Sequence, residues 1–71
     1  MDKVTKKQIE TLDMLLVFKT SQDERFNYSQ GFLSKNAKTD MTRNEANSII
    51  KYINYKNYPK PKSFDNFIKF S

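Results

Sequence analysis

Apolar residues recur every three or four positions in two stretches of this chain, and each stretch follows the same polar signal. Thr5 occupies a helix N-cap position and Gln8 stands three residues later, which is the spacing of a capping box. The residues that follow place one apolar stripe along a helical face: Ile9, Leu12, Leu15 and Leu16. This pattern predicts a helix over residues 6–18. Further apolar residues lie beside the stripe and predict a helix that is central to the core: Met14, Val17 and Phe18.

The second stretch repeats the pattern. Thr42 and Glu45 form another capping-box pair, and they predict a helix over residues 43–55. Its apolar stripe consists of Ala46, Ile49, Ile50 and Ile53. Two amphipathic helices are therefore the frame of the predicted fold.

The remaining segments carry weaker signals. Residues 20–40 contain apolar anchors among turn-forming residues, and they are compatible with a short helix over 29–36 or with a brief strand over 25–28. Pro59 and Pro61 prevent the second helix from continuing. Ser63 then begins a short C-terminal helix over 63–70. We therefore expect one all-α domain over residues 1–71, with three to four helices and a proline-containing connector before the last.

Composition excludes several kinds of chemistry. The 71 residues include no Cys and no His, so disulfides, thiolate or imidazole metal sites and His-assisted nucleophilic catalysis are all ruled out. A single glycine cannot form a glycine-rich phosphate loop. The eight carboxylates lie among polar neighbours, which do not favour an acid pair with one raised pKa. We expect no enzyme, no metal and no cofactor.

The longest apolar run covers residues 14–18, far short of the roughly 20 residues that span a membrane. The first residues are polar and basic, and no signal-peptide pattern follows them. We therefore expect a cytoplasmic protein with no membrane partner.

Charge is concentrated in the second half of the chain. The formal net charge is +5, and residues 36–71 contribute +4 of it. Lysines and tyrosines alternate there in a segment without acids, a pattern typical of a nucleic-acid surface, where ammonium groups neutralise phosphates and rings stack on bases. The candidate nucleic-acid-binding residues are Lys51, Tyr52, Tyr55, Lys56, Tyr58, Lys60 and Lys62. The same residues also suit a solvated helix end, where lysines favour the helix dipole and tyrosines pack at the edge of the core.

Aromatic residues at the end of the chain suggest a second kind of site. Phe64, Phe67 and Phe70 either pack back onto the core or form a strip that docks into a partner. A second copy of the chain and a host protein are both candidate partners, so a homodimer is an open alternative.

The segments 5–12 and 41–50 together carry a resemblance to a family. They read Thr5-Lys6-Lys7-Gln8-Ile9-x-x-Leu12 and Met41-Thr42-Arg43-Asn44-Glu45-Ala46-Asn47-Ser48-Ile49-Ile50. This resembles a small helical module of uncharacterised bacterial and bacteriophage proteins, written approximately T-x-K-Q-x-x-x-L, a loop, then L-T-x-x-E-A-S-x-x-I. The chain departs from it at Met41 and Asn47. The resemblance implies either a phage-type accessory protein that binds nucleic acid or a phage-encoded inhibitor that binds a host bacterial protein.

Overall fold

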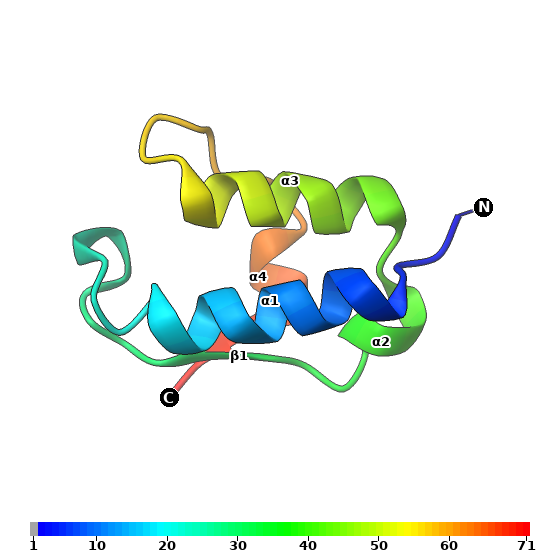
Figure 1. The fold of residues 1–71 in the computed structure, drawn as a ribbon, viewed down its shortest axis with the longest axis horizontal. Helices are drawn as coiled ribbons and strands as arrows, with labels where there is room; N and C mark the ends of the chain where they lie inside the picture. The colour runs from blue at the N-terminus through cyan, green and yellow to red at the C-terminus, as the bar shows by residue number, and fades with distance from the viewer. Residues whose placement is uncertain (1) are drawn as a thin grey trace.

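The structure is a computed structural model that describes residues 2–71. Two longer helices form its frame, and short elements connect and flank them (Figure 1). In chain order the elements are α1 (Lys6–Phe18), the 3-10 helix η1 (Glu24–Phe26), β1 (Gly31–Leu33), α2 (Ala37–Asp40), α3 (Arg43–Asn54), α4 (Phe64–Phe67) and β2 (Ile68–Phe70).

Both predicted capping boxes are present, and they fix where α1 and α3 begin. The Gln8 N–H donates to Thr5 Oγ1 at 3.1 Å, and the Thr5 N–H donates to Gln8 Oε1 at 3.0 Å. Thr42 and Glu45 make the same reciprocal pair at 3.2 and 2.9 Å. These bonds satisfy N–H groups that a helix end leaves without partners, so the helices begin where the sequence predicts.

The first residues of the chain tie these two helix beginnings together. The Val4 N–H donates to the Met41 carbonyl at 2.9 Å, and an isolated antiparallel bridge pairs Lys3 with Thr42. The Gln8 side chain then reaches α3, where its Nε2 donates to Asn47 Oδ1 at 2.9 Å. Figure 1 shows that α1 and α3 run in the same direction. The segment that contains β1 leads back from the end of α1 to the beginning of α3.

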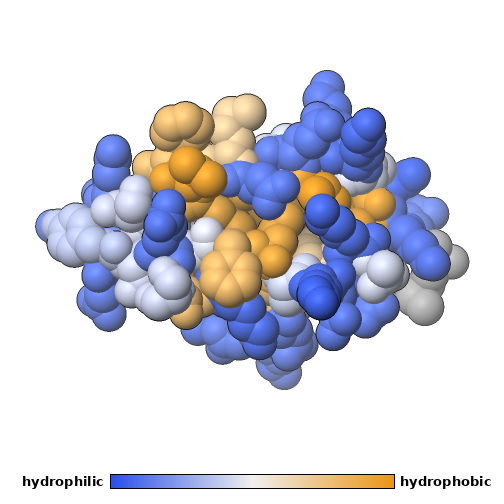
Figure 2. All heavy atoms as spheres, turned by 90° about the horizontal axis from the view of Figure 1, so that it is seen from below, coloured by the Kyte–Doolittle hydropathy of each residue, from blue (hydrophilic) through white to orange (hydrophobic). Residues whose placement is uncertain are grey.

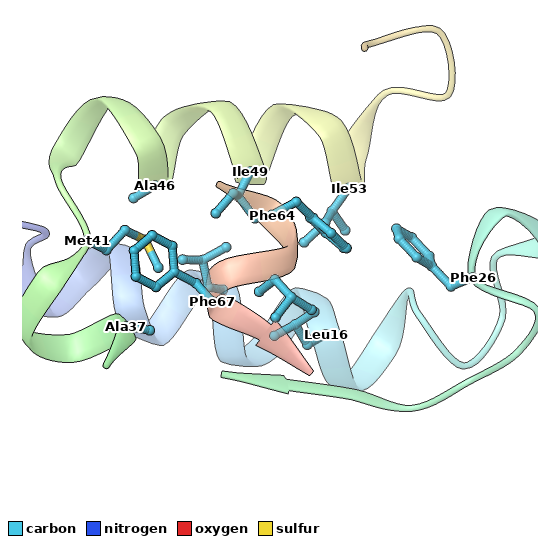
Figure 3. Close-up of a cluster of buried hydrophobic side chains, with 11 residues drawn as sticks. Leu16, Phe26, Ala37, Met41, Ala46, Ile49, Ile53, Phe64 and Phe67 are labelled. Carbon is cyan, nitrogen blue, oxygen red and sulfur yellow. The ribbon is translucent and has the colours of Figure 1, made fainter. Parts of the chain in front are cut away.

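The core lies between α1, α3 and α4. Leu12 and Leu16 of α1 are buried, and α3 buries its predicted stripe except Ile50, which is partly exposed. Figure 3 shows these side chains pointing toward one another from three directions. The buried apolar residues are Leu12, Leu16, Phe26, Ala37, Met41, Ala46, Ile49, Ile53, Phe64, Phe67 and Ile68.

The prediction of an all-α fold is wrong, because the chain also forms an antiparallel sheet of two strands. β1 pairs with β2, and the register places Gly31 opposite Phe70, Phe32 opposite Lys69 and Leu33 opposite Ile68. The fold is therefore mixed α and β. The two strands lie far apart in sequence, so no local pattern in either one indicates its partner.

The predicted helix over 29–36 is absent because β1 takes its place. Gly31 fits there for a steric reason: a Cβ atom on it would lie 3.1 Å from a ring carbon of Phe70 and 3.2 Å from Leu16 Cδ2. The buried hydroxyl of Thr20 accepts a hydrogen bond from the Gly31 N–H at 3.1 Å and itself donates to the Leu16 carbonyl. The end of α1 therefore holds the start of the strand.

The predicted C-terminal helix over 63–70 is also wrong in its second half. α4 ends at Phe67, and Ile68 adopts an extended conformation with φ −109° and ψ 125°. The Ser34 N–H donates to the Phe67 carbonyl at 2.8 Å, which continues the sheet past β1. Pairing with β1 thus replaces the last helical turn.

α1 exposes an apolar face that we expected to be in the core. Met14, Val17 and Phe18 are 60%, 52% and 65% exposed, and Phe32 of β1 is 53% exposed. Residues 14, 17 and 18 share one side of a helix, opposite the buried Leu12 and Leu16. Figure 2 shows hydrophobic side chains gathered on the lower side of the molecule, where α1 and β1 lie. We call Met14, Val17, Phe18 and Phe32 the apolar face.

Candidate nucleic-acid interface

The end of α3 is held by Arg25, which comes from the distant 3-10 helix η1. Its Nη1 donates to the carbonyls of Tyr52 and Tyr55 at 2.6 and 2.9 Å, and its Nη2 donates to the carbonyl of Ile53 at 2.9 Å. The last carbonyls of a helix have no hydrogen-bond partner within the helix and carry partial negative charge. A guanidinium supplies both the donors and the opposite charge. Arg25 therefore fixes the point from which the chain leaves α3.

Asp23 orients this guanidinium. The Asp23 carboxylate accepts from Arg25 Nη2 at 2.9 Å and from the Arg25 backbone N–H at 2.9 Å. The Arg25 side-chain hydrogen bond holds the pKa of the Asp23 carboxyl below its ordinary value of 3.8, and the nearby charge of Lys56 adds to this effect. The ion pair therefore persists at any pH above that value and weakens only in stronger acid.

The loop around Arg25 is a turn rather than the strand over 25–28 that we considered. Asn27 and Tyr28 follow η1 with φ of 53° and 59°, in the left-handed region that ends helical turns. Sequence reasoning missed Arg25 because its partners are backbone carbonyls about thirty residues away. The one local signal was the Asp23-x-Arg25 spacing, since Asp23 caps η1 and reaches Arg25 at the same time.

Tyr52 lies at the edge of the core. Its ring meets Phe64 and Phe26 edge to face, with centroids 5.1 and 5.9 Å away, and the Arg25 guanidinium lies 5.2 Å from its centroid. Two aromatic rings and a cation thus pack against the Tyr52 side chain. Tyr52 is half-buried against these groups, whereas Tyr55 and Tyr58 are exposed.

Five of the other candidate residues are exposed together at the end of α3 and in the loop after it. We call them the tyrosine–lysine surface: Lys51, Tyr55, Lys56, Tyr58 and Lys62. Tyr55 is 62% exposed, and the Lys51 ammonium lies 6.0 Å from the ring of Tyr58. Lys51, Lys56 and Lys62 form no ion pair within residues 2–71. Figure 1 shows the loop rising beyond the end of α3.

Lys60 differs from these lysines because it has local partners. Its ammonium pairs with Asp65 Oδ1 at 2.9 Å and lies 5.4 Å from the centroid of the Phe64 ring. Both charged side chains are well exposed, at 48% and 74%. Such an exposed pair adds little to stability, but it leaves Lys60 with less unpaired charge than the other lysines.

The aromatic residues of the C-terminus are split between core and surface. Phe64 and Phe67 are buried, whereas Phe70 is 39% exposed and stacks on Phe26 with centroids 5.6 Å apart. The strip of three phenylalanines that we considered for a partner is therefore not on the surface as a unit. The aromatic side chains a partner would meet lie elsewhere, at Phe18 and Phe32 in the apolar face.

Comparison with protein-family models, curated protein sequences and solved structures gives no match for this chain. The resemblance to a phage and bacterial module therefore stays a prediction. Residues 2–71 hold no cluster of three His, Cys, Asp or Glu side chains that could bind a metal ion. None of the helices in the described part is long and apolar enough to cross a membrane.

Arg25→Lys tests the anchor of α3. A lysine ammonium cannot bridge the carbonyls of Tyr52, Ile53 and Tyr55 in the fixed geometry of a guanidinium, so we expect the free energy of unfolding to fall by about 2 kcal/mol. Urea unfolding followed by circular dichroism measures this. Arg43→Lys, at an exposed position, is the matched control and should change stability by less than about 0.5 kcal/mol. Equal effects of the two substitutions would show that Arg25 does not anchor the helix.

Proposed function

We propose that this protein is a small accessory protein that binds nucleic acid in the cytoplasm through the tyrosine–lysine surface. The observation that carries the proposal is the exposure of three lysines without ion pairs beside two tyrosines, at one end of α3. Lysines of this kind neutralise phosphates and release counterions, which gives most of the free energy of nucleic-acid binding at low salt.

The charge distribution supports the same proposal. The net charge of +5 is carried mostly by residues 36–71, so the end of α3 and the loop after it lie in the basic part of the molecule. Tyr55 and Tyr58 supply ring faces next to the lysines, which suits contact with bases or sugars. Arg25 and Asp23 fix the end of α3 through contacts that engage none of these lysines in an ion pair.

Charge-removal variants test the proposal. The triple variant Lys51→Gln, Lys56→Gln and Lys62→Gln should bind a mixed-sequence oligonucleotide about tenfold more weakly at low salt. The slope of log affinity against log salt should fall by about 2 to 3, because three phosphate contacts are lost. Fluorescence anisotropy at two or more salt concentrations measures both quantities.

The matched control removes the same charge elsewhere, through Lys6→Gln, Lys7→Gln and Lys35→Gln. This variant also has a net charge of about +2, and its affinity should stay within about threefold of the wild type if location matters more than total charge. Equal weakening of both variants would argue against a defined surface. No binding of the wild type at low salt would refute the proposed function.

A second candidate function is binding to a host protein, and the apolar face favours it. Four large apolar side chains that are each more than half exposed form a larger patch than scattered surface residues do. A pocket of about 280 Å³ adjoins this face at Phe18 and could receive a side chain of the partner; Tyr28 and charged residues, among them Lys56, complete its lining. In this alternative the positive charge speeds the encounter and the apolar face supplies the affinity.

The double variant Val17→Ser and Phe18→Ser tests this alternative. Both side chains are exposed, so we expect the fold to persist and capture of a stoichiometric partner from a nuclease-treated bacterial lysate to be lost. Tyr55→Ser, which removes an exposed aromatic ring outside the apolar face, should leave the capture unchanged. A lysate that yields no stoichiometric protein, or equal capture by wild type and double variant, would count against the host-protein function.

A further inference from the structure

The outward side of α3 carries amides and cations only. Its exposed residues are Arg43, Asn44, Asn47, Lys51 and Asn54, which we call the outer face of α3. At 100° per residue these positions fall within about one third of the helix circumference, opposite the buried Ala46, Ile49 and Ile53. They therefore form one continuous strip along the whole helix.

Charge on this strip has a single sign. Glu45 is the one carboxylate within residues 43–55, and it is half-buried and accepts a hydrogen bond from the Thr42 N–H at 2.9 Å. The outer face of α1, in contrast, mixes lysines with Glu10, Asp13 and the apolar side chains. Of the two long helices in the described part of the chain, α3 is thus the one that a polyanion could approach along its full length.

We infer that the outer face of α3 enters the major groove of duplex DNA and contacts base edges through its asparagines. This inference rests on the proposed function and deepens it by naming the substrate class. A helix fits the major groove, which is about 12 Å wide, and an asparagine amide can both accept from and donate to adenine N6 and N7. Lys56 and Lys62 lie beyond the end of the helix, where they can contact phosphates and set its register.

The spacing of the asparagines sets the size of the site. Asn44, Asn47 and Asn54 lie on one side of α3 over ten residues, which is about 15 Å along the helix axis. Base pairs repeat about every 3.4 Å along the duplex, so this strip spans about four to five base pairs. Because asparagine matches adenine best, the preferred site should be rich in A·T pairs.

The structure also fixes the amide in the middle of the strip. Gln8 Nε2 donates to Asn47 Oδ1 at 2.9 Å and approaches the Arg43 carbonyl at 3.3 Å. With its oxygen engaged by α1, Asn47 presents only its Nδ2 hydrogens as donors, which suit the N7 acceptor of either purine, so the preference for adenine rests on Asn44 and Asn54. A single strand would need stacking rings instead, and the outer face of α3 carries none, because the exposed Tyr55 and Tyr58 lie beyond the end of the helix.

Selection from a random-sequence duplex pool tests the inference. The wild type should enrich an A·T-rich motif of about four to five base pairs and should bind the enriched duplex about tenfold more tightly than a scrambled one. The triple variant Asn44→Ala, Asn47→Ala and Asn54→Ala should lose this preference to within about twofold. Its affinity for the scrambled duplex should stay close to that of the wild type, because its lysines are intact.

A control variant separates a general loss of polarity from a loss at the outer face. The control is the triple variant Asn36→Ala, Asn57→Ala and Asn66→Ala. It changes three exposed asparagines outside α3 and should keep the preference for the enriched duplex. Circular dichroism checks that each triple variant is folded.

The remaining outcomes are distinguishable. Duplex binding without any enriched motif, or tighter binding to the matching single strand than to the duplex, would overturn the inference and leave nucleic-acid binding in place. Retention of the full preference by the Asn44, Asn47 and Asn54 variant would also overturn it. Binding to neither form at low salt would refute the proposed function together with the inference.

Discussion

The contact of Arg25 with the last carbonyls of α3 is the constraint on which the rest of the structure depends most. One guanidinium satisfies three backbone oxygens, pairs with Asp23 and lies against the ring of Tyr52. It therefore joins the segment between the helices to the end of α3, with the aromatic cluster beside it. Because a domain this small has a limited core, a partly buried cap of this kind has a large share in the stability of the whole domain.

The molecule exposes two kinds of surface, which adjoin at the pocket lined by Phe18 and Lys56. On the side of α3, the chain exposes asparagines, tyrosines and lysines that have no ion-pair partners within residues 2–71. On the side of α1 and β1, it exposes Met14, Val17, Phe18 and Phe32. Polyanions are attracted to the first surface and apolar groups to the second, so one small domain presents a basic surface and an apolar one.

The sequence predicted the elements whose signals are local. Capping boxes and apolar periodicity place α1 and α3 correctly because each bond they make lies within a few residues. The sheet could not be predicted in this way, since Gly31 and Phe70 are distant in sequence and meet only in the folded chain. The apolar face was missed for another reason: α1 carries apolar residues on two sides, and periodicity alone does not say which side faces the core.

The residues of the candidate site also divide into those that the sequence indicated and those that it did not. Composition located the lysines and tyrosines at the end of α3 and after it, but it could not separate Tyr52, which is half-buried at the edge of the core, from Tyr55, which is exposed. Nor could it indicate Arg25, because nothing in the residues around Arg25 reveals that its partners are the carbonyls of Tyr52, Ile53 and Tyr55. Side-chain burial and non-local backbone contacts decide both questions.

Nuclear magnetic resonance of the labelled protein during addition of a short duplex tests most directly whether nucleic acid binds the tyrosine–lysine surface and the outer face of α3. Binding at the proposed surface should shift amide signals within residues 43–62, with the largest changes at Asn44, Lys51 and Tyr55. Signals of Met14, Val17, Phe18 and Phe32 should stay in place. Shifts concentrated at those four residues, or no shifts at low salt, would contradict the account.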